Sequence, residues 1–95
     1  MNRVLLSGIL QSATEQQAGQ KTVLIVRLRV TEHFKGQPRS FPVELRAFRD
    51  MEVIKAIQPG TMVEIEGRVS GREAREGKYA GRVFQDIVLD RIQEA

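Results

Sequence analysis

The sequence predicts a small all-β domain with one short helix, in which five strands close into a barrel in the order β-β-β-α-β-β. Apolar and polar residues alternate over most of the chain, and this period of two is typical of strands. One segment after residue 50 instead spaces its apolar residues as a helix does. The 95 residues suffice for a single domain, residues 1–95, with a small core.

The first strand is expected over Asn2–Leu10. It contains Gly8, and a glycine inside a strand usually marks a bulge or a sharp bend. The polar segment Gln11–Lys21 follows and predicts a connection. The second strand is then expected over Thr22–Thr31.

The second and third strands are expected to flank a loop over His33–Ser40, which contains Gly36 and Pro38. The third strand follows over Phe41–Phe48. Alternation predicts that the inward side chains of these two strands are Val26, Leu28, Val30, Val43, Leu45 and Ala47. The outward side chains are then Arg27, Arg29, Glu44, Arg46 and Phe48.

A short helix is expected after the third strand. Asp50 is a suitable N-cap, because its carboxylate can accept hydrogen bonds from the free amides of the first turn. Val53, Ile54 and Ile57 lie at helical spacing and form one apolar stripe. Pro59–Gly60 then ends the helix.

The fourth strand is expected over Met62–Ser70 and the fifth over Arg82–Ile92. Between them, the charged segment Gly71–Gly81, with its three glycines, predicts a hairpin tip. The inward side chains of the two strands are expected to be Val63, Ile65, Val69, Val83, Ile87 and Leu89.

This order of elements is the pattern of the OB-fold. A small antiparallel sheet must cover its edges or close on itself, and five strands with a bend in the first form such a closed barrel. The apolar stripe of the helix is expected to plug the open end of the barrel. An SH3-like barrel is the alternative, but such barrels rarely place a two-turn helix at this point.

Composition excludes several classes of protein and site. The chain has no cysteine, which excludes disulfides and thiolate metal sites, and its lone histidine, His33, is expected to be a solvated loop residue. No phosphate-binding GxxxxGK[ST] motif and no catalytic constellation is present, so we expect no enzyme, no cofactor and no metal. No apolar run approaches the roughly 18 residues of a membrane span, and the N-terminus lacks the features of a signal peptide. A cytoplasmic location is therefore expected.

Basic residues concentrate in two segments. Residues 27–49 carry six basic and two acidic side chains, and residues 68–82 carry five and two, whereas the remainder carries four and eight. Eleven of the fifteen cations are arginine, whose guanidinium binds phosphates and stacks on flat rings. The pattern indicates a localised anion-binding surface. Solvated strand faces and a charged hairpin tip are the other interpretation.

All five aromatic residues lie in or near these basic segments: Phe34, Phe41, Phe48, Tyr79 and Phe84. A cationic groove with aromatic planes is what binding of single-stranded nucleic acid requires, and each stacked base contributes about 1–3 kcal/mol. Small OB barrels often bind such strands on the face of the second and third strands and on flanking loops.

Each aromatic residue also has a structural interpretation. Phe48 can be tucked under the helix start, Phe34 and Tyr79 can pin their loops, and Phe84 can be a dimer contact. Phe41 shares the parity of the inward Val43 and is therefore expected in the core. The arginines Arg27, Arg29 and Arg46 can pair with Glu44 across strands at little energetic gain.

The sequence resembles the bacterial single-stranded DNA-binding proteins over nearly the whole chain. The opening MNRVLLSGIL resembles their MNKVxLxGxL, and QPGTMVEIEGRV resembles their KKGxxVxVEGxL block; VRLRVTEHFKG, VELRAFRDMEVI and RVFQDIVLDRIQ also match. The resemblance implies an OB domain that binds single-stranded DNA without sequence preference and without chemistry. The family's stacking aromatics correspond to Phe34 and Phe48. A family tryptophan in the last hairpin falls near Ala74 and is missing or replaced by Tyr79, and a second falls near Phe41 or Pro42.

Members of that family usually carry a disordered tail ending in an acidic peptide that recruits other proteins. This sequence stops at Ala95 and in this respect resembles the tail-less primosomal replication protein N branch, so it is either such a relative or a truncated member. Both groups form homo-oligomers, dimers in the branch and tetramers in the family, and replication or repair proteins are further implied partners.

We therefore expect a single-stranded DNA-binding protein of replication, repair or recombination. The expected nucleic-acid-binding residues are Arg27, Arg29, Phe34, Lys35, Arg46, Phe48, Arg72, Arg75, Lys78, Tyr79 and Arg82. Two alternatives remain open at this point. One is an OB module that binds proteins and no nucleic acid, and the other is RNA as the ligand.

Overall fold

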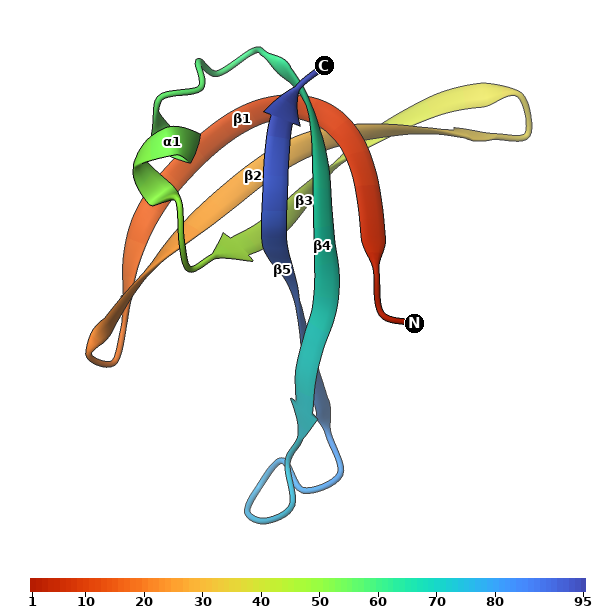
Figure 1. The fold of residues 1–95 in the computed structure, drawn as a ribbon. Helices are drawn as coiled ribbons and strands as arrows, with labels where there is room; N and C mark the ends of the chain where they lie inside the picture. Colours follow the sequence, from red (N-terminus) through yellow and green to blue (C-terminus); the bar gives the residue numbers. More distant parts are fainter.

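The computed structural model describes residues 1–95 as a closed barrel of five strands with one short helix. The predicted order of elements is confirmed. In chain order the elements are β1 Val4–Ala18, β2 Lys21–Phe34, β3 Gln37–Ala47, α1 Met51–Lys55, β4 Met62–Glu73 and β5 Val83–Glu94. The strands close in the order β1-β2-β3-β5-β4, which is the arrangement of an OB-fold (Figure 1).

The extent of backbone pairing differs between neighbouring strands of the barrel. The first half of β1, Val4–Ile9, pairs with β4, and the second half, from Ile9 to Ala18, pairs with β2. The pairs β2–β3 and β4–β5 form long antiparallel ladders. The β3–β5 seam, in contrast, consists of a single parallel bridge between Arg46 and Val88.

The core lies inside the barrel and α1 covers one end of it. The predicted inward residues Val26, Leu28, Leu45 and Ala47 are fully buried, and the alternation of β2 and β3 is confirmed. Ile54 of α1 is also fully buried in the same cluster, so the helix plugs the barrel as predicted. The complete cluster is Leu10, Leu24, Val26, Leu28, Leu45, Ala47, Ile54, Val63, Ile65 and Leu89.

Two details of the helix differ from the prediction. Val53 is exposed, and the side chains that contact the core are the buried Ile54 and the partly buried Met51 and Ile57, the last of which follows the five-residue helix. Asp50 precedes the helix in a left-handed conformation with φ 57°, and its carboxylate makes no capping hydrogen bond. This helix is far too short to cross a membrane, and the structure contains no other.

Two segments predicted as a connection and a loop are strands. Gln11–Lys21 continues β1 and begins β2, with Ala18 paired to Lys21, and His33–Ser40 continues β2 into β3. Polar composition misled the prediction, because these strand ends project beyond the core and need no apolar face. The β2–β3 turn contains two residues, Lys35 and Gly36, both with positive φ as a type I′ turn requires.

Two irregularities bend the strands. The pairing of β1 with β2 passes from Leu10 to Ser12, which leaves Gln11 as a bulge. Gly8 itself is not bulged, but β1 bends over the barrel here and a Cβ on Gly8 would lie 2.7 Å from the Arg29 carbonyl oxygen (Figure 1). On β5 the pairing passes from Leu89 to Arg91, so Asp90 is the extra residue of a second bulge.

The hairpins extend beyond the barrel as arms, and this position exposes three residues that were predicted to face inward. Val69 and Val83 keep their expected place in the strands but lie on the β4–β5 arm, where no opposite wall covers them (Figure 1). Phe41 is exposed for the same reason on the β2–β3 arm, in which all β3 residues before Val43 are exposed. Alternation predicts the face of a strand but not where the barrel ends.

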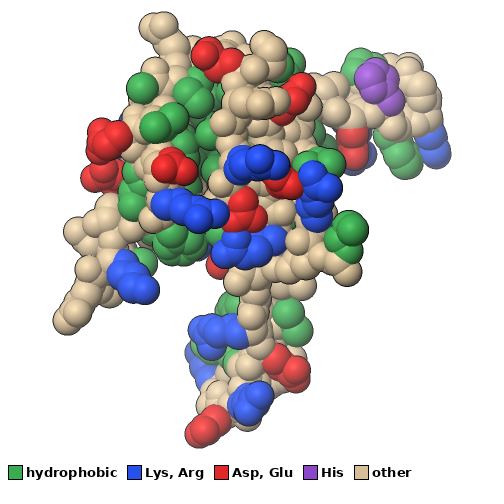
Figure 2. Space-filling model, in the orientation of Figure 1, with side chains coloured by type: hydrophobic (Ala, Val, Ile, Leu, Met, Phe, Trp, Pro, Cys, Tyr) green, Lys and Arg blue, Asp and Glu red, His purple; other side chains and the backbone are tan.

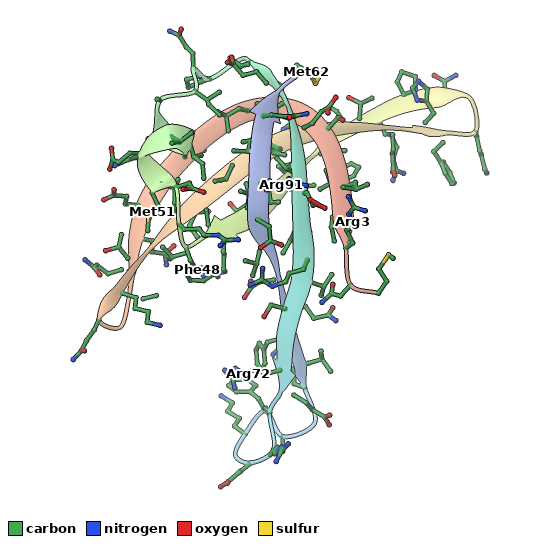
Figure 3. All side chains as sticks on the ribbon, in the orientation of Figure 1. Arg3, Phe48, Met51, Met62, Arg72 and Arg91 are labelled. Atoms are coloured by element: carbon green, nitrogen blue, oxygen red, sulfur yellow. The ribbon has the colours of Figure 1, made fainter.

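A charged network on the outer surface joins β1, β4 and β5. Glu66 accepts hydrogen bonds from Arg3 at 2.6 Å and from Arg91 at 3.0 Å, and the two arginines lie on either side of β4 (Figure 3). The hydrogen bonds from Arg91 and from Arg3 hold the pKa of the Glu66 carboxyl below its ordinary value of 4.5.

The plug contributed by α1 predicts a sharp difference between two adjacent residues. Ile54→Ala is expected to lower the free energy of unfolding by about 2–5 kcal/mol, because it leaves a cavity in the core. The exposed neighbour makes Val53→Ala a matched control, which is expected to change stability by no more than about 0.5 kcal/mol. Urea denaturation of both variants measures the difference, and equal effects would show that α1 does not plug the barrel.

The Glu66 network predicts a specific pH dependence of stability. Because the folded-state pKa is depressed, the contribution of Glu66 is present above its ordinary pKa and is lost as pH falls through the lower folded value. Glu66→Gln lacks this contribution, so its urea midpoint is expected to fall less than that of the wild type between neutral pH and about pH 3. Parallel pH profiles for the two proteins would contradict the assignment.

Candidate nucleic-acid interface

The outward arginines of β2 and β3 lie on the barrel face as predicted, but each has a partner. Arg27 lies 3.6 Å from Glu44 across the strand pair and donates to the bulged Gln11. Arg46 contacts Asp86 of β5 at 3.0 Å, and Arg29 donates to the Ser40 hydroxyl at 3.2 Å. The barrel face therefore presents guanidinium groups whose charge is partly compensated by carboxylates.

The tip of the β2–β3 arm carries the first aromatic cluster. Phe34 is 53% exposed, and the ammonium of Lys35 and the guanidinium of Arg39 lie 5.5 and 5.3 Å from the centre of its ring. The two-residue turn brings Lys35 back beside Phe34, and the antiparallel pairing places Arg39 opposite Glu32 on the same arm. A flat ring flanked by cations results.

The β4–β5 arm carries the second and larger cluster. Tyr79 and Phe84 meet edge to face, with ring centres 6.4 Å apart and planes at 87°. The guanidinium of Arg82 lies 5.5 Å from the centres of both rings, that of Arg72 lies 5.1 Å from Phe84, and Lys78 lies 5.6 Å from Tyr79. Such distances allow cation–π attraction, which holds flexible cations in place on the arm.

Backbone hydrogen bonds define the tip of this arm. The amide of Ala74 donates to the Arg82 carbonyl at 2.9 Å, and the amide of Gly81 donates back to the Ala74 carbonyl at 2.7 Å. The amide of Arg82 donates to the Tyr79 carbonyl, which folds the tip so that Tyr79 approaches the strand end. Arg75 lies at the tip and forms no ion pair or cation–π contact.

Phe48 lies where β3 ends and is half exposed, as predicted. Its ring lines a groove of about 310 Å³ at the β3–β5 seam, together with Val88 and Leu89 of β5 (Figure 3). Three charged residues complete the lining: Arg49, Arg68 and Asp90. The carboxylate of Asp90 accepts a hydrogen bond from Arg68 and lies 4.0 Å from Arg49.

The predicted binding residues therefore form three groups on different parts of the surface. The groups are the β2–β3 arm, the β4–β5 arm, and the barrel face with its seam. Figure 2 shows basic, acidic and apolar side chains together on the β4–β5 arm, and basic and acidic side chains close together over the barrel body above it. A ligand that touches all three groups must be extended and flexible.

Charge compensation differs between these groups. On the β4–β5 arm, Arg72, Arg75, Lys78 and Arg82 form no ion pair with a carboxylate, whereas Arg27, Arg46, Arg49 and Arg68 each do. These four cations outnumber the two carboxylates of the same arm, Glu73 and Glu76, so the arm carries an excess of positive charge. No group of three or more His, Asp or Glu side chains lies close enough together to hold a metal ion.

Sequence reasoning missed four side chains of these clusters. Arg39, Arg49 and Arg68 lie inside the basic segments, but their contacts with Phe34 and Asp90 depend on strand pairing. Phe84 was noted as an aromatic residue near the basic segments but was left out of the expected binding residues; in the structure it meets Tyr79 of the same hairpin and lies beside Arg72. Pairing across a two-residue turn at Lys35–Gly36 is the signal that would have found Arg39.

Comparison with known proteins identifies solved structures that share this fold. No family model and no curated protein matches the sequence. Among solved structures, a Plasmodium falciparum SSB in complex with ssDNA superposes with a TM-score of 0.69 at 14% identity, covering 100% of this chain and 95% of that one. A small single-stranded DNA-binding protein from Mycoplasma pneumoniae gives 0.63 at 18% identity, with coverages of 99% and 93%.

A third similar structure is a deletion mutant of the single-stranded DNA-binding protein from Thermus aquaticus. It gives a TM-score of 0.68 at 21% identity, covering 100% of this chain and 50% of that one. The resemblance noted in the sequence is thus confirmed at the level of the fold: the chain has the OB-fold of single-stranded DNA-binding proteins.

Proposed function

We propose that this protein binds single-stranded DNA without sequence preference and catalyses no reaction. One observation carries the proposal: Phe34, Phe48 and Tyr79 are each about half exposed, and each lies beside at least two basic side chains. Exposed rings would stack bases while the neighbouring cations contact phosphates. The similar SSB from Plasmodium falciparum is described as a complex with ssDNA, which supports the same ligand class here.

The arrangement favours a single strand over a duplex. The rings of Phe34, Tyr79 and Phe48 belong to the two arms and the seam, so a ligand must expose unpaired bases and bend between them to use more than one. Ring faces accept any base, because every base has a π face, and this supports binding without sequence preference. The excess of cations on the β4–β5 arm would attract the strand before the rings engage it.

We propose that the DNA contacts come from the residues expected from the sequence, with three additions. Arg27, Arg29, Lys35, Arg46, Arg72, Arg75, Lys78 and Arg82 would contact phosphates, and Phe34, Phe48 and Tyr79 would stack bases. Arg39, Arg49 and Arg68 join them on the geometry of the clusters. A role in replication, repair or recombination in the cytoplasm, with protein partners from those processes, follows as part of the same proposal.

Association of this chain with itself is supported by the free edge of β1. The stretch Val4–Gly8 pairs with β4 on one side only, and Leu5 on this stretch is well exposed. An unpaired strand edge beside an exposed leucine is a surface that a second copy can cover. We therefore propose a homo-oligomer, as either a dimer or a tetramer.

Two alternatives lead to different measurements. RNA would use the same rings and cations, and competition between matched DNA and RNA oligomers separates the two ligands. A module that binds only proteins would use the exposed rings as a partner surface and would show no affinity for oligonucleotides. The basic arms favour a nucleic acid over this second alternative.

Binding of oligo-dT is expected to weaken steeply as salt increases. Each phosphate contact releases condensed counterions, so log K is expected to fall against log salt concentration with a slope of about −0.7 per contact. Fluorescence anisotropy of end-labelled oligo-dT at several salt concentrations measures the slope. Absent binding, or binding that does not respond to salt, would refute the proposed function.

Removal of the Phe48 ring is expected to separate binding from stability. Phe48→Ala should weaken oligo-dT binding by about 1–3 kcal/mol through the lost stacking, while the melting temperature stays nearly unchanged because the ring is half exposed. Val53→Ala, a change at another exposed apolar side chain, is the control and should leave binding intact. A large fall in the Phe48→Ala melting temperature would instead show a structural role for the ring.

A further inference from the structure

The groove at the β3–β5 seam combines an exposed ring with an excess of positive charge. Arg49 and Arg68 line it together with only one acidic residue, Asp90, and Phe48 forms one wall. Two other grooves lack this combination. The groove on the β1–β4–β5 surface is lined by Arg3 and Arg91 with Glu64 and Glu66, and that on the β1–β2–β3 face by two arginines with two glutamates; neither has an aromatic wall.

The position of Asp90 results from the bulge in β5. Leu89 and Ile92 both contact the core although two residues separate them. In a regular strand, neighbouring side chains on the same face are separated by only one residue. Asp90 is the extra residue, and a bulge re-aims the side chain that it adds. The carboxylate consequently reaches two arginines from different elements, Arg68 of β4 and Arg49 after β3.

The contact between Asp90 and Arg49 is loose. The nearest atoms lie 4.0 Å apart, and the Arg49 side chain is 72% exposed, so it can turn toward a ligand without losing a strong bond. Ion pairs near the surface are weak, so an anion that reaches the same guanidinium groups can displace the carboxylate. A phosphate is such an anion, because its oxygens match the guanidinium fork as well as a carboxylate does.

We propose that this groove is a nucleotide subsite in which Asp90 occupies the place of a DNA phosphate in the free protein. On binding, a phosphodiester takes over Arg49 and Arg68, the neighbouring base stacks on Phe48, and Asp90 turns to solvent. The carboxylate thereby acts as an intramolecular competitor that lowers the affinity for the strand. This inference rests on the proposed binding of single-stranded DNA.

The network around Glu66 supplies a matched control. Glu66 is also held by two arginines, its side chain is 22% exposed against 25% for Asp90, and its replacement changes the net charge equally. Its groove has no ring and no excess of arginine. Asp90→Asn is therefore compared with Glu66→Gln, and Arg68→Gln with Arg91→Gln, by anisotropy titration of end-labelled oligo-dT at several salt concentrations.

We expect Asp90→Asn to bind oligo-dT about two- to fivefold more tightly than Glu66→Gln, because the strand no longer has to displace the carboxylate from Arg49 and Arg68. Arg68→Gln should bind more weakly than Arg91→Gln and reduce the salt slope by about 0.7, the value for one phosphate contact. Thermal melting without DNA checks that each variant is folded. If Asp90→Asn does not fold, the comparison of Arg68→Gln with Arg91→Gln alone tests the proposed subsite.

Two outcomes would overturn the inference alone while leaving the proposed function standing. In one, the wild type binds with the expected salt dependence but Asp90→Asn binds no more tightly than Glu66→Gln. In the other, Arg68→Gln keeps the wild-type slope. A wild type that does not bind oligo-dT at all overturns both, so the two failures are distinguishable.

Discussion

The barrel depends on side-chain packing at the β3–β5 seam, because the backbone closes it there with a single bridge. One bridge cannot hold two strands in register, so Leu45 and Ala47 of β3 must be held against Leu89 of β5 by apolar contacts. Ile54 completes these contacts at the barrel end. Because packing and not backbone pairing closes the barrel here, the outer side of the seam is a groove and not a continuous sheet.

Because the β3–β5 seam is open, the region that closes the barrel also contains the groove proposed to bind DNA. Phe48 follows the last residue of β3, and without a paired neighbour strand its ring remains half exposed. Asp90 of β5 lines the same groove and pairs with Arg49 and Arg68, whereas Asp86 of β5 pairs with Arg46 of β3. These pairs lie at or near the surface, and they therefore add little to stability.

The arms would extend the proposed binding surface beyond the barrel. Their strands outrun the core, so apolar side chains at their ends meet solvent and not an opposite wall. Basic side chains lie against these exposed rings: Lys35 and Arg39 lie beside Phe34, and Arg82 lies near both Tyr79 and Phe84. Rings and charges thus stay accessible and at the same time restrained, which would reduce the ordering cost of the proposed binding of a flexible strand.

The sequence alone determined the order of elements, the inward and outward faces of β2 and β3, and the exposure of Phe48, because these features follow from alternation over neighbouring residues. It did not predict the Lys35–Gly36 turn, the exposure of Phe41 and Val53, or the contacts of Asp90. Those features depend on where the barrel ends and on which strands pair. Such pairings join residues far apart in the chain, and only the tertiary structure decides them.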